Sequence, residues 1–249
     1  MPRQTLHKSP HPQTEAWPPE RPGMGLLSDE SSKHVYRQSC AQIAAAIESS
    51  GFKYAKSKQR CRRTIGAFEN DITFQSSHYN VSGRHVQLWM HANVSSIQLQ
   101  KWRAQYVPPD SASTHVAGGM VHLLGTRFAL VQWELADPSD RAATILDAVE
   151  FIRKEVLPFF SRFEDTPALV SELATHAVPA FDLVPAVEFC LCFGGKAEGQ
   201  AALNRFVRER PDLQSAIAAE QVTPSANTLN RPGNYVEQVV CLRLRYDLR

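Results

Sequence analysis

The side chains best suited to chemistry are histidines and a tryptophan in one part of the chain. His85, Trp89 and His91 alternate along one side of an extended segment, where imidazole and indole groups suit catalysis, metal binding or protein contacts. Six residues of strand place His85 and His91 roughly 20 Å apart, so the two cannot bind one metal ion together. A cross-strand pair of His78 and His85 beside Gln75 is the catalytic alternative. The simpler interpretation is that these histidines occupy a polar face without a special role.

A basic segment without acidic residues is the most asymmetric feature of the sequence. Six cations fall within eleven positions: Lys53, Lys56, Lys58, Arg60, Arg62 and Arg63. On a strand Arg60 and Arg62 share one face, which would attract an acidic protein surface or a nucleic-acid backbone. A solvated edge protected from aggregation is the alternative. Because only Phe52 and Tyr54 interleave with these charges and the net charge is +2, nucleic acid is the weaker of the two ligands.

Two short patterns resemble cofactor sites but fail on spacing. Cys190 and Cys192 are one residue apart, and a helix would point them about 200° apart, so they read as small core residues. The run Gly194-Gly195-Lys196 lacks the earlier glycine of a phosphate loop, and no Ser or Thr follows the lysine. Nucleophile-elbow, zinc-protease, dinucleotide and EF-hand motifs are all absent from the sequence. We expect no cofactor, no metal and no enzymatic activity.

Bulk composition predicts a globular protein of the cytoplasm. The chain has 249 residues, 43% hydrophobic and 21% charged, an ordinary balance for one or two domains. No stretch approaches the roughly 18 consecutive apolar residues of a membrane span, and the proline-rich N-terminus lacks the apolar core of a secretory signal. The five cysteines, an odd and sparse set, indicate reduced thiols.

Prolines and a change of periodicity divide the first part of the chain. Residues 1–27 contain six prolines, which disfavour helix and interior strand and predict a disordered arm. A helix is expected from Asp29, a good N-cap residue, to Gly51. Apolar residues then recur at every second position. The strands expected there are 60–65, a segment around Ile72 and Phe74, and 86–94, joined as an antiparallel meander with a turn at 80–83.

The middle of the chain predicts a short helix, a loop and a hairpin. We expect the helix at 96–106 and the loop, with two prolines and two glycines, at 107–120. Strand character returns at 121–124 and 128–135, with a turn at Gly125 and Thr126. The sheet would then have about five strands.

A long amphipathic helix is expected to cover this sheet. Asp137 as N-cap and Pro138 at the first helical position mark its start. Pro158 is expected to kink or end it, because proline cannot donate a backbone hydrogen bond. Its apolar stripe consists of Ile145, Leu146, Val149, Ile152 and Val156.

The last part of the chain predicts more helices and a final strand. Prolines at helix starts and the Gly194-Gly195 break place the helices at 167–176, 184–193, 196–209 and 211–219. The tail 222–233 is turn-rich, and the alternation from Val240 to Tyr246 predicts a strand at the sheet edge.

These elements define an α+β fold class: an antiparallel sheet of about five strands covered by helices, with a C-terminal helical extension. The expected divisions are a disordered arm at 1–27, an α+β core domain at 28–165, a helical extension at 166–221, and a loop and strand at 222–249.

Several short motifs occur in a characteristic order. Gly51-Phe52-Lys53 precedes the strand Ile72-Thr73-Phe74-Gln75-Ser76-Ser77 and the long alternating strand 85–94, and Trp133 stands ahead of the helix begun by Asp137. Over residues 30–175 this order resembles a family of uncharacterised bacterial α+β domains with a Gly-Phe start and a Phe-Gln-x-Ser strand. The resemblance implies helices packed on an antiparallel sheet, with no agreed activity and no catalytic residues. Some small bacterial domains of this general kind are immunity proteins encoded beside toxin genes, which is an analogy.

These features favour a cytoplasmic, non-enzymatic protein-binding module, in its specific form an immunity protein that covers the active site of a toxin. The residues expected to bind the partner are Arg60, Arg62, Arg63, His85, Trp89 and His91. A nucleic-acid-binding or regulatory protein that uses the basic segment 53–63 is the alternative. An enzyme built on His78, His85 and Gln75 comes third.

Overall fold

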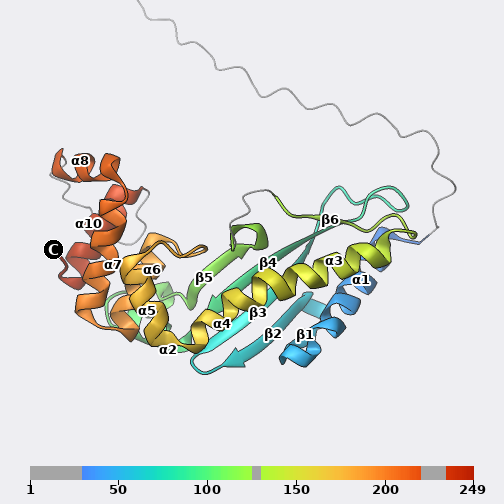
Figure 1. Ribbon diagram of the computed structural model, residues 1–249, viewed down its shortest axis with the longest axis horizontal. Coiled ribbons are helices and arrows are strands. Elements are labelled where there is room, and N and C mark those ends of the chain that lie inside the picture. Colours follow the sequence, from blue (N-terminus) through green and yellow to red (C-terminus); the bar gives the residue numbers. More distant parts are fainter. Residues whose placement is uncertain (1–29, 125–129, 220–233) are drawn as a thin grey trace, which may run out of the picture.

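The described chain combines an antiparallel sheet with helices on one face and a lobe of helices at one end (Figure 1). It is a computed structural model that describes residues 30–124, 130–219 and 234–249. The predicted α+β class is confirmed. The predictions for the arm 1–27 and the tail 222–233 lie outside the described residues.

Six strands make up the sheet of the described chain. Five follow the spatial order β1-β2-β3-β4-β5, and β6 pairs with β4; all pairings are antiparallel. The predicted antiparallel meander of 60–65, the segment around Ile72 and Phe74, and 86–94 is confirmed as β2, β3 and β4, whereas β1 was not expected. The strands are β1 Lys53–Ala55, β2 Arg60–Ile65, β3 Phe68–Ser76, β4 Gln87–Ser95, β5 His115–Met120 and β6 Trp133–Glu134.

The strand register separates an apolar face from a polar face. Ile72 lies opposite both Cys61 and Ala92, and all three side chains are fully buried. Phe74 and Met90 pair in the same way. The predicted apolar side of 86–94 is confirmed, because alternate residues of a strand point to opposite sides and every second one here is buried.

The fifth strand corrects the prediction of a loop at 107–120. β5 contains Gly118 at φ +130°, a backbone conformation that favours glycine. A Cβ on Gly118 would lie 2.2 Å from the carbonyl oxygen of Ala92, so only glycine allows the two backbones to approach this closely. The paired glycines that suggested a loop therefore serve a strand.

The predicted hairpin of strands 121–124 and 128–135 is also wrong in its first half. Residues Val121–Leu123 form a 3₁₀ helix, η4. The turn at Gly125 and Thr126 lies outside the described residues. Of the second predicted strand, 128–135, only the two residues of β6 form a strand, and they pair with β4.

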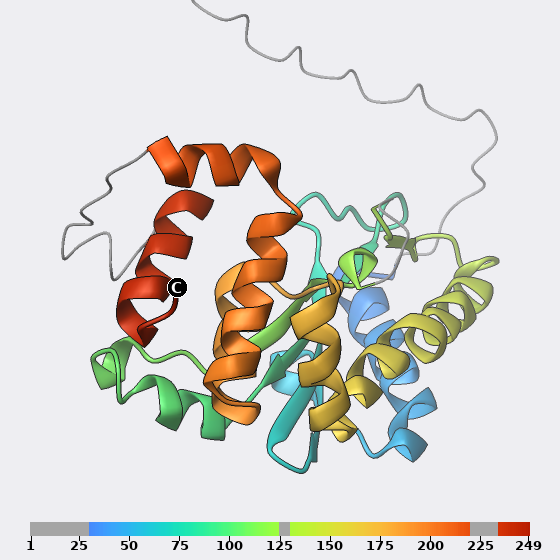
Figure 2. The same ribbon diagram turned by 60° about the vertical axis from the view of Figure 1, so that its left-hand side comes forward.

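Two helices close the apolar face of the sheet. α1 (Ser32–Ala46) is capped by Ser31, whose hydroxyl accepts from the amide of His34, whereas the proposed cap Asp29 lies outside the described residues. α3 spans Arg141–Phe151 and packs beside α1, as Figures 1 and 2 both show. Their apolar residues join those of the sheet in one buried cluster.

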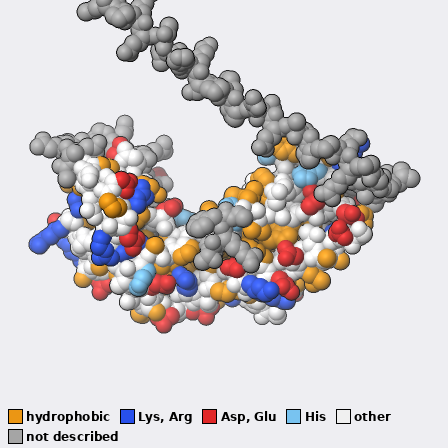
Figure 3. All heavy atoms as spheres, turned by 45° about the horizontal axis from the view of Figure 1, so that its top comes forward, with side chains coloured by type: hydrophobic (Ala, Val, Ile, Leu, Met, Phe, Trp, Pro, Cys, Tyr) orange, Lys and Arg blue, Asp and Glu red, His pale blue; other side chains and the backbone are white. Residues whose placement is uncertain are grey.

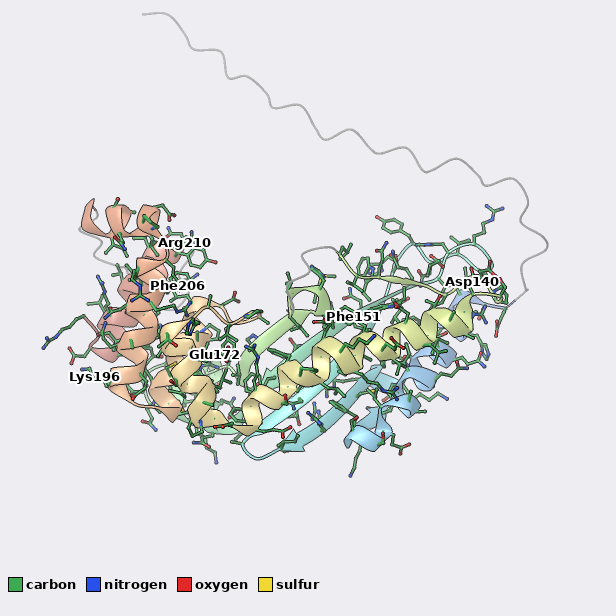
Figure 4. All side chains as sticks on the ribbon, in the orientation of Figure 1. Asp140, Phe151, Glu172, Lys196, Phe206 and Arg210 are labelled. Carbon is green, nitrogen blue, oxygen red and sulfur yellow. The ribbon has the colours of Figure 1, made fainter. Side chains whose placement is uncertain are left out.

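The long helix begins later, and continues further, than its prolines predict. The carboxylate of Asp137 accepts from Ser139 in a turn, and Asp140 precedes the first residue of α3, so the predicted start at Asp137 and Pro138 is wrong. Pro158 does not end the helical segment, because a π-helical turn, η5 (Ile152–Val156), leads into α4 (Leu157–Ser161), which contains the proline in its first turn. Figure 4 labels Asp140 and Phe151 at the two ends of α3.

The predicted apolar stripe of this helix is right at four of its five positions. Ile145, Val149, Ile152 and Val156 are buried. Leu146 is 66% exposed, so the prediction was wrong there. Leu146 follows directly after Ile145, and a 100° step along the helix carries its side chain toward solvent.

The helical lobe follows the sequence prediction closely until its last element. Its helices are α2 Ile97–Arg103, α5 Thr166–Thr175, α6 Leu183–Phe193, α7 Lys196–Arg208, α8 Pro211–Ala219 and α10 Tyr235–Tyr246. The predicted final strand is wrong, since α10 occupies it. Val239, Leu242 and Tyr246 are buried at helical spacing, and Leu244 is 61% exposed. Asn234 caps α10 by accepting from the amide of Glu237.

Aromatic side chains join the lobe to the sheet. The ring of Phe68, on β3, lies 5.3 Å from Phe163, 6.0 Å from Phe189 and 5.4 Å from Phe193 between centroids. Figure 3 shows that the lobe and the far end of the sheet enclose a hollow in which hydrophobic side chains reach the surface. No helix in the described residues is long and apolar enough to cross a bilayer.

Candidate binding face of the sheet

The polar face of the sheet brings most of the predicted binding residues together. One row of the register runs Arg60, Thr73, His91 across β2, β3 and β4, and the neighbouring row runs Arg62, Asp71, Asn93. Gln75 lies opposite Trp89 in the next row. These side chains are half-buried or exposed, unlike the opposite face. We call this surface the polar face.

His91 is held at the centre of the polar face by Gln75. Its Nε2 lies 2.8 Å from the side-chain oxygen of Gln75. Because an amide oxygen only accepts, Nε2 carries the proton and Nδ1 is left as an acceptor. Burial lowers the pKa of His91 below its ordinary value of 6.5, and nearby His122 lowers it further. His91 is therefore a neutral hydrogen-bonding group at neutral pH.

Trp89 offers its ring beside this pair. Its indole nitrogen donates to the side-chain oxygen of Gln132 at 3.3 Å, which fixes the orientation of the ring. The side chain is half-buried, so part of the ring stays accessible. An accessible tryptophan fixed by a hydrogen bond is typical of the aromatic anchors of protein interfaces.

The basic segment divides into paired and unpaired cations. Arg62 forms an ion pair of 2.7 Å with Glu69, and Lys53 lies directly across from Arg62 in the β1–β2 pair. Like charges opposite each other on two strands are unfavourable unless an anion lies nearby. Arg63 is paired as well, with Glu164. The remaining four side chains form no hydrogen bond or ion pair with any described residue: Lys53, Lys56, Lys58 and Arg60.

These four cations occupy a single hairpin. β1 and β2 are joined by a 3₁₀ turn, η2 (Lys56–Lys58), which places two lysines at its tip. Lys53 and Arg60 follow on the strands, on the side of the polar face. We call residues 53–60 the basic hairpin. The hairpin contains no acidic residue, so its positive charge is not balanced locally.

Arg63 does not belong to this surface. It follows Arg62 on β2 and points to the covered side, where it donates to the carbonyl of Ser50 at 3.1 Å. Its guanidinium lies 4.9 Å from the ring centre of Phe52 and 3.8 Å from the carboxylate of Glu164. Burial lowers the pKa of Arg63. Its role is to tie β2 to the covering elements.

His85 lies at the margin of the polar face, in the connection between β3 and β4. Its Nδ1 is 2.5 Å from a carboxylate oxygen of Glu134. The other oxygen of Glu134 accepts from the amides of Val86 and Ala136. His85 therefore helps to hold β6 against β4, and its Nδ1 is already engaged.

The catalytic alternative does not assemble among the described residues. Gln75 contacts His91, and His85 contacts Glu134, while no hydrogen bond or ion pair joins either to His78. No group of three His, Cys, Asp or Glu residues in the described ranges is arranged to hold a metal ion. None of the five cysteines, all of them described, forms a disulfide.

One polar cluster was not predicted from the sequence. Arg103 and Glu188 form a buried ion pair of 2.6 Å between α2 and α6, outside the polar face. Neither residue stands in a motif, and 85 positions separate them. Only an isolated charge within an otherwise apolar helix, as at Glu188 in α6, gave a local signal.

Comparison with known proteins adds no relative: no family model, no curated protein and no solved structure matches this chain. The likeness to uncharacterised bacterial α+β domains stays a prediction from the sequence.

Proposed function

We propose that this chain is a non-enzymatic protein-binding module that docks an acidic partner on the polar face and the basic hairpin. The observation that carries this proposal is an accessible tryptophan on the polar face, on the same side of the sheet as Lys53 and Arg60, together with two further lysines at the tip of the basic hairpin. None of these four cations forms a hydrogen bond or ion pair with a described residue. Tryptophan and arginine are the residues that most often dominate binding energy at interfaces.

The two parts of this surface have different tasks. The basic hairpin raises the rate of encounter with an acidic surface, because unpaired exposed charges act over several ångströms. The centre of the polar face, with Trp89, His91 and Gln75, supplies the contact that excludes water. Asp71 accepts from the hydroxyl of Thr73, so its charge is partly satisfied within the face.

In its specific form the proposal is an immunity protein of the cytoplasm that covers the active site of a toxin. Five cysteines that form no disulfide with one another support a reducing compartment. The acidic groups of such a partner need not be its catalytic groups. It is enough that acidic residues flank the active site, because the basic hairpin lies at the sheet edge and would contact the rim of the interface.

Photocrosslinking in the native host tests this proposal. The variant carries a photoreactive phenylalanine derivative at position 89, and a matched control carries it at position 146, where Leu146 is exposed on α3. We expect one discrete crosslinked protein of acidic isoelectric point from position 89 and none from position 146. Charge reversal by Lys53→Glu and Arg60→Glu should remove the product.

Two results would overturn the proposal. Equal products from positions 89 and 146, or no discrete protein at position 89, would show that the polar face is not an interface. A crosslink to nucleic acid in place of protein would favour the alternative, in which the basic hairpin contacts phosphates and Trp89 stacks on a base.

A further inference from the structure

A cavity lies in the helical lobe, beside the ion pair of Arg103 and Glu188. It has a volume of about 230 Å³ and is bounded by α2, α6 and α10 and by the segment that leads into β5. Its apolar walls include Val184, Pro185 and Leu242, and its uncharged polar lining includes Ser111, Ser113 and Gln238. Nothing in the proposed protein-binding role makes use of this space.

Arg103 holds one hydrogen-bond donor at the wall of this cavity. Its Nε donates to Glu188 at 2.6 Å, and its Nη1 donates to the carbonyls of Ser113 and His115 at 2.7 and 2.6 Å. These three hydrogen bonds fix the plane of the guanidinium. Its Nη2 makes no hydrogen bond to a described residue and is reached by solvent, although the side chain is only 6% exposed. Nη2 is therefore a fixed donor that a ligand in the cavity can use.

The charged groups of the lining already have partners. One carboxylate oxygen of Glu188 accepts from Arg103, and the other accepts from the hydroxyl of Tyr246 at 2.7 Å. Arg245 lies 3.9 Å from Glu188, and its guanidinium is 5.9 Å from the ring centre of Tyr246. A charged ligand would lose hydration in this half-enclosed space without meeting a free counter-charge. The cavity therefore favours an uncharged ligand.

Two titratable groups of the lining add no charge at neutral pH. Burial, followed by the charge of Arg103, lowers the pKa of His115 below its ordinary value of 6.5, so its imidazole is neutral. Burial raises the pKa of the Cys241 thiol, which keeps this group protonated. Both groups are compatible with an uncharged ligand.

Gln238, on α10, offers a donor and an acceptor together. Its side chain is half-buried in the lining, and its amide makes no hydrogen bond to a described residue. The amide oxygen accepts and the amide nitrogen donates, so a second amide satisfies both. A partly buried polar group without a partner costs free energy. A ligand that pairs with Gln238 therefore binds more tightly than one that cannot.

The size and the walls of the cavity limit the rest of the ligand. The volume falls below the roughly 300 Å³ at which drug-sized pockets begin, so the ligand is small. The apolar walls gain from contact with a hydrocarbon group.

We infer that this cavity binds a small uncharged amide, whose carbonyl oxygen accepts from Nη2 of Arg103, whose amide group pairs with Gln238, and whose hydrocarbon part lies against the apolar walls. The inference is independent of the proposed protein-binding role, because the lining shares no residue with the polar face or the basic hairpin.

Isothermal titration of the full chain with two sets of matched probes tests the inference. The amides are benzamide and butyramide. Benzoate and butyrate carry a charge in nearly the same shape, and acetophenone and 2-pentanone keep the carbonyl but lack the N–H donors. We expect one-site binding of at least one amide, and binding at least tenfold weaker for its carboxylate and about tenfold weaker for its ketone.

A pair of matched variants places the amide at Gln238. Gln238→Met removes the polar group at nearly constant shape, and it should weaken amide binding about tenfold while changing ketone binding less than twofold. Gln105→Met makes the same change at an exposed position outside the cavity and should alter neither more than twofold. A merely structural effect of Gln238→Met would weaken both ligands equally.

A third variant tests the cavity itself. Val184→Phe should abolish binding by filling the space, with circular dichroism showing an intact fold. The inference fails if neither amide binds at millimolar concentration, or if the carboxylate or the ketone binds as tightly as its amide. It also fails if Gln238→Met affects amide and ketone alike, or if Gln105→Met matches it.

Discussion

Arg103 on α2 and Glu188 on α6 form a buried ion pair of 2.6 Å, although 85 positions separate them in the chain. Arg103 also donates to two carbonyl groups of the segment before and at the start of β5. A single guanidinium thus joins α2, the sheet and α6. The pair links the helical lobe to the sheet by hydrogen bonds, beside the aromatic contacts of Phe68.

Removing the carboxylate of this pair should destabilise the whole fold. Glu188→Ala leaves Arg103 charged and buried and takes the acceptor from Tyr246, so we expect a loss of about 3–5 kcal/mol in the free energy of unfolding. Glu172→Ala, which breaks an exposed pair with Arg162, should cost about 0–1 kcal/mol. Urea denaturation measures both. Equal costs would show that the buried pair does not hold the lobe in place.

Gly118 should tolerate no side chain. Gly118→Ala would place Cβ 2.2 Å from the carbonyl oxygen of Ala92, and we expect a cost of about 3 kcal/mol or more. Gly66→Ala is the control, because Gly66 has φ +56° with nothing within 4 Å of its Cβ, so only backbone strain of about 1–2 kcal/mol applies. Thermal unfolding compares the two variants. A milder effect at Gly118 than at Gly66 would contradict the close approach of β5 to β4.

Neighbouring residues of α3 should respond differently to truncation. Ile145→Ala removes a buried side chain and should cost about 2–5 kcal/mol. Leu146→Ala removes a side chain that is 66% exposed and should change stability by less than about 0.5 kcal/mol. Urea denaturation of both variants measures the difference. The reverse order would mean that α3 turns its other side to the sheet.

Acid should weaken the fold through His91. Burial lowers the pKa of His91 below 6.5 in the folded state, so below that pH the unfolded chain binds the proton more readily. The contribution of neutral His91 to the free energy of unfolding is therefore fully present above about pH 6.5. It is lost as the pH falls through the pKa that His91 has in the folded state. His91→Gln should reduce this loss of stability, measured by urea denaturation across the range. An imidazole signal of His91 that titrates at or above 6.5 by NMR would contradict the lowered pKa.

The sequence predicts those elements whose periodicity follows from burial of one face. The apolar residues of β4 alternate cleanly with polar ones because this strand has one covered side. Helix α8 is bounded by Pro211 as expected. Where two periods compete, prediction fails. In α10 the alternation from Val240 to Tyr246 predicted a strand, but the segment is a helix whose buried residues Val239, Leu242 and Tyr246 are three and four positions apart.

The candidate site is only partly predictable for a related reason. Arg60, Arg62, Trp89 and His91 share a face because alternation within strands is a local rule. The same rule places Arg63 on the covered side. Assigning both Arg62 and Arg63 to the binding surface therefore contradicted strand alternation. Which cations find partners depends on tertiary contacts, such as Arg62 with Glu69 and His85 with Glu134, that no local period encodes.

The central claim is tested most directly by measuring the affinity of this chain for the partner protein that crosslinks to position 89. Lys53→Glu together with Lys58→Glu reverses two unpaired cations of the basic hairpin, and Lys101→Glu together with Arg208→Glu makes the same change of net charge on α2 and α7. The account predicts at least tenfold weaker binding for the hairpin variant and less than twofold for the other. Equal weakening by both pairs would contradict it.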